Sequence, residues 1–167
     1  MYRFINFMIF CALFFYVQSG FTQVKNQHIS GQSFSGEISI NASPERVWKV
    51  LTDAKQFAEI LGYEYTSGVK QFTKVGDDAK IKVWGEAGNL MLVYANPEKE
   101  LRFNLDPENG TYICNCRWVL TESGKGTNLW FEERYTESGS QTKEELDAQV
   151  KEHNEALEKL KMKAEKK

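Results

Sequence analysis

The sequence predicts an α+β fold in which a curved antiparallel sheet of about seven strands wraps around one long C-terminal helix. Apolar residues recur with period two from residue 63 to residue 137, two short helical segments follow a first strand at 35–41, and an apolar stripe with helical spacing occupies residues 142–164. A long sheet with a single long helix to cover it must curve around that helix to hide its apolar face. The gap between helix and sheet is then a natural apolar cavity.

Length and charge limit the class of protein. The 167 residues suffice for one domain, and 41% hydrophobic with 26% charged residues is typical of a soluble globular chain. The formal net charge is −2. Because no strongly basic surface follows from this balance, we expect no nucleic-acid partner.

Residues 1–22 have the pattern of a secretory signal peptide. Arg3 precedes the apolar run 4–17, which is followed by the small and polar residues Gln18, Ser19 and Gly20. The run is shorter than the roughly 20 residues that span a bilayer, so an uncleaved anchor is the weaker alternative. We expect cleavage after Ser19 or after Thr22, a flexible lead at 23–33, a single domain at 34–167 that does not span a membrane, and a secreted or periplasmic location.

Helix boundaries carry strong local signals. Ser43 is a predicted N-cap with Pro44 at the first helical position, and Asp53 offers a cap to a second short helix at 54–61. Thr142 and Glu145 form a capping box at the start of the long helix. The stripe of that helix comprises Leu146, Val150, His153, Leu157, Leu160 and Ala164.

The period-two region divides into six predicted strands, at 66–75, 79–85, 89–95, 100–105, 111–121 and 127–136. Turn residues separate them at 76–78, 86–88, 96–98, 106–110 and 122–126. Links this short make neighbouring strands antiparallel.

The segment 38–53, Ile-Ser-Ile-Asn-Ala-Ser-Pro-Glu-Arg-Val-Trp-Lys-Val-Leu-Thr-Asp, resembles the opening of START-like (SRPBCC) proteins, a superfamily that includes polyketide cyclase-like proteins and lipid carriers. The strand 101–103 after the Pro97 turn and the Gly126-Thr127 hairpin are also similar. The resemblance covers roughly residues 34–161 and implies a helix-grip fold with a hydrophobic ligand cavity between sheet and long helix. No residue set matches a catalytic motif of the enzymatic branches, so no catalytic residue is assigned.

Candidate cavity residues lie on the inward faces of the predicted elements. One strand face carries Tyr112, Cys114, Cys116, Trp118 and Leu120, which is equally the pattern of a packed core. The full candidate set is Phe103, Tyr112, Cys114, Cys116, Trp118, Phe131, Glu133, Val150, His153 and Leu157.

Cys114 and Cys116 are predicted to be buried free thiols. Residues two apart on a strand have α-carbons roughly 6.5–7 Å apart, so a disulfide between them would be strained. Zinc needs four ligands, and only His28 and His153 remain as nitrogen donors, with His28 in the flexible lead. We therefore expect neither a metal nor a cofactor.

His153 and Glu133 are the polar residues in otherwise apolar patterns. His153 is either a packed, hydrogen-bonded histidine or a polar anchor able to orient a ligand or act as an acid or base. Glu133 is in step with Leu129, Phe131 and Tyr135 and so points inward unless a bulge turns it out. A pair of the two in an apolar pocket would be a catalytic candidate.

The sequence thus favours an exported protein that holds a small hydrophobic molecule, lipid-like or polyketide-like. One alternative is an enzyme of the cyclase, dehydratase or hydrolase type that uses the same cavity. Another is a protein-interaction module like the chaperone-ATPase activators of the same superfamily, with Trp84 and Trp130 on its surface.

Overall fold

The computed structural model describes residues 25–26, 32–108, 110, 112–137 and 141–166. The predicted signal peptide lies outside the described residues, as do Gln23, Val24 and residues 27–31 of the predicted lead. Lys25–Asn26 forms a two-residue strand, β1, where the sequence indicated no regular structure. It pairs with Phe34 and Ser35 of the next strand, β2 (Gln32–Ile40).

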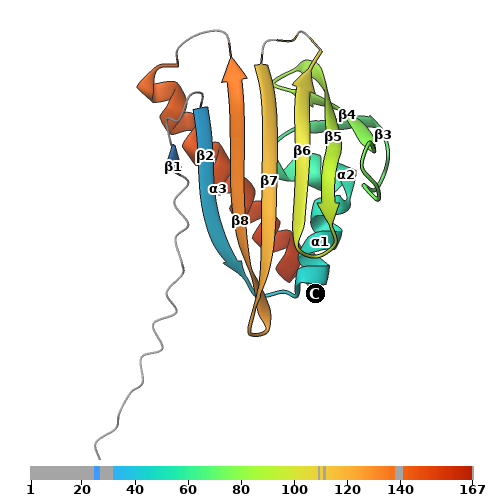
Figure 1. Ribbon diagram of the computed structural model, residues 1–167. Helices are drawn as coiled ribbons and strands as arrows, with labels where there is room; N and C mark the ends of the chain where they lie inside the picture. Colours follow the sequence, from blue (N-terminus) through green and yellow to red (C-terminus); the bar gives the residue numbers. More distant parts are fainter. Residues whose placement is uncertain (1–24, 27–31, 109, 111, 138–140, 167) are drawn as a thin grey trace, which may run out of the picture.

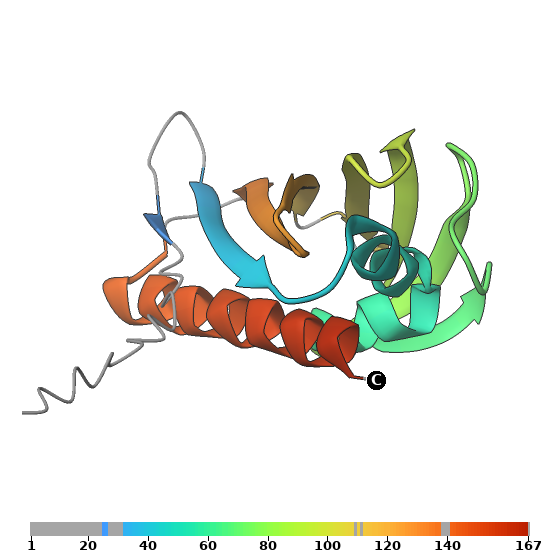
Figure 2. The ribbon, with the colours of Figure 1, turned by 90° about the horizontal axis from the view of Figure 1, so that it is seen from below.

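The described strands form one antiparallel sheet in the order β1-β2-β8-β7-β6-β5-β4-β3 (Figure 1). The strands after β2 are β3 (Glu64–Gly68), β4 (Asp78–Val83), β5 (Glu86–Asn96), β6 (Glu100–Pro107), β7 (Tyr112–Ser123) and β8 (Gly126–Glu137). Figure 2 shows the sheet curving around the long helix α3 (Lys143–Glu165), as the sequence predicted. The short helices α1 (Pro44–Thr52) and α2 (Ala54–Ile60) pack beside the C-terminal end of α3.

Two predictions about the strands were wrong. The segment 66–75 is strand only as far as Gly68, whose φ of +102° ends the regular backbone, and the Asp77 carboxylate instead accepts hydrogen bonds from the Thr73 and Lys74 amides. The turn predicted at 86–88 lies two residues earlier, at Trp84 and Gly85. Both have positive φ, +49° and +90°, as a two-residue hairpin turn requires.

The predicted helix caps are confirmed. Ser43 Oγ accepts from the Arg46 amide, and Asp53 Oδ1 accepts from the Gln56 amide. At the start of α3 the capping box is complete, because the Thr142 amide donates to Glu145 Oε2 and the Glu145 amide donates to Thr142 Oγ1.

The hydrophobic core lies between the concave face of the sheet and the helices. Its centre is an aromatic cluster in which Phe57 of α2 contacts Phe103 and Trp118, with ring centroids 4.6 and 5.6 Å apart. Trp118 also lies against Phe131, with centroids 4.5 Å apart. This cluster joins α2 to the three central strands.

Helix α3 is held mainly by its C-terminal half. Its buried residues are Ala156, Leu157, Leu160 and Ala164, whereas Leu146 and Val150 in the first half are only partly buried. Near the C-terminal end the Asn41 amide donates to Glu165 Oε1 at 2.7 Å. The first half of α3 is therefore the less firmly packed wall of the core.

Candidate functional site

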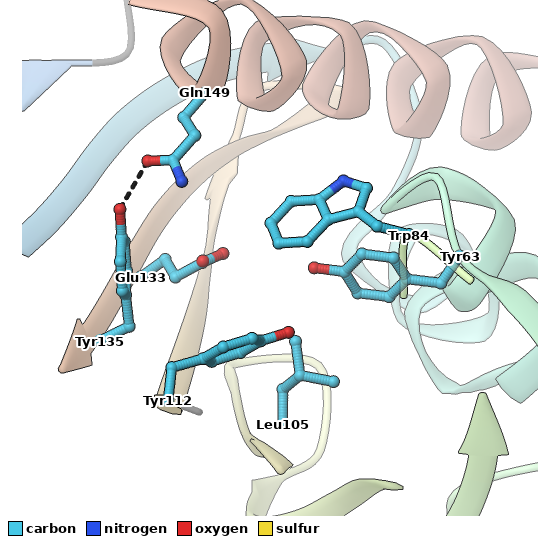
Figure 3. A pocket seen from close by; sticks show the side chains of 7 residues that line it. All are labelled: Tyr63, Trp84, Leu105, Tyr112, Glu133, Tyr135 and Gln149. Atoms are coloured by element: carbon cyan, nitrogen blue, oxygen red, sulfur yellow. Dashed lines mark hydrogen bonds between the residues drawn. The ribbon is translucent and has the colours of Figure 1, made fainter. Parts of the chain in front are cut away.

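A small cavity lies beside the N-terminal half of α3. Its volume is about 30 Å³, room for about two water molecules. The lining residues are Tyr63, Trp84, Leu105, Tyr112, Glu133, Tyr135 and Gln149. In Figure 3 the Tyr63 hydroxyl and the Glu133 carboxylate point into this space from opposite sides.

Glu133 forms a buried pair with His153. Nε2 of His153 lies 3.0 Å from Glu133 Oε2, and the two side chains are 13% and 12% exposed. Nδ1 of His153 lies 2.6 Å from the Gln149 carbonyl oxygen. Because a carbonyl oxygen only accepts, Nδ1 carries a hydrogen and Nε2 is the nitrogen that faces the carboxylate.

The contact between the two groups favours an imidazolium–carboxylate ion pair. Burial disfavours both charged forms, but the attraction between the two groups and their hydrogen bonds outweigh it. The pKa of His153 is therefore raised above its ordinary value, and the pKa of Glu133 is lowered below its own. The imidazole stacks on Phe34, with centroids 4.8 Å apart, and tilts against Phe131 at 5.4 Å. Aromatic ring faces at these distances stabilise a positive charge, here that of the imidazolium.

The two cysteines lie next to this pair. Their Sγ atoms are 3.7 Å apart, both residues are buried and free, and Cys116 Sγ lies 3.8 Å from Glu133 Oε2. The prediction of buried, unbridged thiols is thus confirmed. The hydrogen bond with Cys116, together with burial, raises the pKa of Cys114 well above its ordinary value. For Cys116 the hydrogen bond with Cys114 acts the other way, but burial and the nearby Glu133 carboxylate leave its pKa raised as well.

Three tyrosines supply further hydroxyl groups. Burial raises the pKa of Tyr63 and of Tyr112, so both stay neutral hydrogen-bond donors near neutral pH. Tyr135 Oη lies 2.5 Å from Gln149 Oε1 (Figure 3). It also lies 2.7 Å from Gln141 Oε1. The cavity therefore combines aromatic walls with one acidic and several hydroxyl groups.

The predicted site residues occupy three environments. Tyr112 and Glu133 line the cavity, and His153 reaches it through its contact with Glu133. Phe103, Trp118, Phe131 and Leu157 are packed in the core, and Val150 is partly buried against that core. Cys114 and Cys116 lie between the core and the Glu133 carboxylate.

Five of the lining residues were not among the predicted cavity residues. Tyr135 and Leu105 lie on inward strand faces, so the period-two pattern that selected Glu133 and Phe103 also reaches them. Tyr63 precedes the first strand of that region, and Trp84 was assigned to the predicted strand 79–85 rather than to the turn in which it lies. Gln149 is one residue off the apolar stripe of α3.

A second hollow lies on the outer face of the sheet. It has a volume of about 530 Å³, and its lining includes Tyr94, Arg102, Arg117, Glu132 and Arg134. Its arginines are already paired, because Glu100 Oε1 accepts from Arg102 and Arg117 and Glu132 accepts from Arg134. This larger hollow is therefore an ion-paired surface groove, and the unusual chemistry lies on the concave side.

Comparison with known proteins identifies the family. Residues 36–131 match the CoxG family, which takes its name from a subunit of carbon monoxide dehydrogenase. The chain belongs to the CoxG family. This agrees with the START-like resemblance of the sequence. No curated protein matches the chain significantly in sequence.

Solved structures support the same fold. Protein CV1439 from Chromobacterium violaceum is 14% identical with a TM-score of 0.66, and the alignment covers 81% of this chain and 98% of that one. CalU16 from Micromonospora echinospora is 18% identical with a TM-score of 0.59, over 86% and 84% of the two chains. Ara h 8.0201 is 10% identical with a TM-score of 0.59, over 79% and 96%. At these identities the likeness establishes the helix-grip fold alone. Within the described residues, every helix is too short or too polar to cross a membrane.

Proposed function

We propose that this protein binds a small hydrophobic molecule with a polar end in the cavity beside the first half of α3. The observation that carries the proposal is the buried Glu133–His153 pair at the edge of a cavity with aromatic walls. Burying an ion pair is seldom the most effective way to stabilise a core, so the pair suits recognition better than stability. The helix-grip fold and the START-like resemblance support this function.

Ligand entry requires the cavity to enlarge. A volume of about 30 Å³ is far below the roughly 300–1,000 Å³ of ordinary ligand pockets. Two parts of the wall are suited to move. The first half of α3 is only partly buried, and Trp84 is 69% exposed on a turn of the β4–β5 hairpin. We propose that these parts separate to admit the ligand and close over it.

The polar groups indicate which ligand end is recognised. The Glu133 carboxylate accepts hydrogen bonds, and the neutral Tyr63 and Tyr112 hydroxyls both donate and accept. A hydroxyl or amino group on a lipid-like or polyketide-like body satisfies these groups, while the aromatic rings cover its apolar part.

Blocking the cavity tests the proposal. We expect Gln149→Trp to weaken binding of a fluorescent fatty-alcohol probe by about tenfold or more, because an indole from α3 would occupy the space of the probe. The matched control is Lys151→Trp, which adds the same side chain on the exposed face of α3. Equal affinity of the two variants, with both still folded by circular dichroism, would contradict the proposed site.

The Glu133–His153 pair also favours a second candidate, an enzyme of the cyclase, dehydratase or hydrolase type with His153 as general acid or base. In that case His153→Ala would reduce turnover by about 10²-fold or more. In a carrier the same change weakens ligand binding by about 1–2 kcal/mol, the scale of one lost buried hydrogen bond, and the ligand is recovered chemically unchanged. Mass spectrometry of the bound molecule before and after incubation separates the two.

We further propose that the protein is exported after removal of residues 1–22, on the basis of the charge, apolar run and small-residue order at its start. N-terminal sequencing of the protein from its native cells should find a start between residues 18 and 24. Intact Met1 or Tyr2 in the cytosol would contradict export.

A further inference from the structure

Four side chains of the kinds that bind transition metals meet at the edge of the cavity. Cys114 and Cys116 come from β7, Glu133 from β8 and His153 from α3. One donor atom from each of Cys114, Cys116 and Glu133 lies within 4.8 Å of the other two. His153 lies outside this group of mutually close donors, but its Nε2 is 3.0 Å from the Glu133 carboxylate.

The sulfur spacing is the one that a tetrahedral ion requires. With metal–sulfur bonds of about 2.3 Å, two sulfurs on one tetrahedral zinc ion lie about 3.8 Å apart. The observed separation of Cys114 Sγ and Cys116 Sγ is 3.7 Å. Both thiols reach this spacing from one face of one strand, since their positions differ by two residues.

His153 has the orientation of a metal-bound histidine. Its Nδ1 donates to the Gln149 carbonyl oxygen, which leaves Nε2 directed at the Glu133 carboxylate. Metal-binding histidines almost always donate their other ring nitrogen to a backbone carbonyl or carboxylate, because that bond fixes the ring and the tautomer.

We propose that Cys114, Cys116 and Glu133 form a site for a borderline-soft divalent cation such as Zn²⁺, and that His153 becomes the fourth ligand when its ring moves toward the sulfurs. On binding, both thiol protons and the proton shared by Glu133 and His153 leave for solvent. Two thiolates and one carboxylate then surround the ion, so the site has a net charge of −1. No metal was expected from the sequence, because only histidines were considered as the remaining ligands. The structure adds Glu133 to the donor set.

The proposal goes beyond ligand binding, since the ion would occupy a position at the edge of the cavity whether or not a hydrophobic molecule is present. A thiolate set favours zinc or another transition metal over Mg²⁺ and Ca²⁺, which prefer oxygen donors. The aromatic rings of Phe34 and Phe131 shield His153, and so limit access of water to one side of the site.

Cobalt substitution tests the site. The purified protein is stripped with a chelator and titrated with Co²⁺. We expect one equivalent to bind, with the near-ultraviolet thiolate-to-cobalt charge-transfer band and the intense visible bands of a tetrahedral ion, and Zn²⁺ to bleach both. Cys114→Ser and Cys116→Ser should remove most of the charge-transfer band, and His153→Ala should weaken Zn²⁺ binding by about tenfold or more. The matched control, Asn115→Ser, changes the residue between the cysteines on the outer face and should bind as the wild type does.

A wild-type protein that gives no thiolate band with Co²⁺ would overturn the proposal, and this result needs no variant to fold. The same conclusion follows if the band persists in both serine variants. Probe binding measured on the chelator-treated protein keeps the two proposals separate. If the probe binds but no metal site is found, only the metal proposal is overturned. If a metal site is found but the probe does not bind, only the proposed carrier function is overturned.

Discussion

Replacing the Glu133–His153 pair by apolar side chains should cost far less than removing either partner alone. The two charged groups are 3.0 Å apart and about seven-eighths buried. At that distance their attraction is about 5 kcal/mol with an effective dielectric constant of about 20. His153→Phe keeps a ring between Phe34 and Phe131 but leaves the Glu133 carboxylate unpaired. Removing one partner of a buried pair costs about 3–5 kcal/mol, and we expect His153→Phe and Glu133→Leu each to fall in that range.

The double variant should lie within about 1 kcal/mol of the wild type, because a buried pair exchanged for apolar residues of similar size is often neutral. The free energy of unfolding is measured for all four proteins by urea denaturation in the presence of a chelator, which excludes any metal effect. Because the two single losses together exceed the loss in the double variant, the cycle should give a coupling of about 5 kcal/mol or more. If each single variant loses less than about 1 kcal/mol of unfolding free energy, and the two losses simply add in the double variant, the pair is solvated. That result would contradict a site from which water is excluded.

Three further predictions concern other parts of the chain. Glu100 is paired with Arg117, which lowers the pKa of the Glu100 carboxyl. The stability that this ion pair contributes is present at neutral pH and is lost as the pH falls through the folded-state pKa. Glu100→Gln should therefore lower the melting temperature more at pH 7 than at pH 3. Gly126→Ala should cost about 2 kcal/mol or more in urea denaturation, since the added Cβ would lie 2.4 Å from the Ile40 carbonyl oxygen, and an unchanged midpoint would contradict that packing. Trp84→Gly should relieve a positive φ worth roughly 1–2 kcal/mol at an entropic cost of roughly 0.5–1 kcal/mol, a net gain in stability of about 0.5–1 kcal/mol. It should also weaken probe binding, and a variant that binds the probe as the wild type does would exclude Trp84 from the cavity mouth.

Much of the fold could be predicted because its signals are local. The Ser43-Pro44 start of α1 and the Thr142/Glu145 box depend on residues three apart, and each hydrogen bond that they predict is present. Alternation along β6 and β7 follows the period-two pattern, since inward side chains there are buried and outward ones are not.

The errors arose where backbone conformation departs from residue preference. A bulky residue rarely adopts positive φ, so the pair Trp84-Gly85 was a weaker turn signal than the Gly88 segment. The turn therefore fell two residues earlier than the composition indicated. The strand predicted at 66–75 ends early because Gly68 has a positive φ and the Asp77 carboxylate accepts hydrogen bonds from the Thr73 and Lys74 amides.

The candidate site was predictable only in part. Glu133 and His153 drew attention because each interrupts an apolar face. Their contact depends on the position of α3 along the sheet, and no local sequence pattern determines that position. The same position of α3 puts Gln149 at the cavity and Leu157 in the packed part of the core.

The central claim is that the ligand binds on the concave side, at the cavity beside α3. The indole N–H signals of the four tryptophans test it in one experiment, since Trp84 lines the cavity, Trp118 lies in the core and Trp130 lies on the outer face beside Arg117. On titration of a ¹⁵N-labelled protein with the fatty-alcohol probe, we predict a saturable shift of the Trp84 signal and an unmoved Trp130 signal. A saturable shift of Trp130 with Trp84 unmoved would place binding in the outer groove and contradict the account.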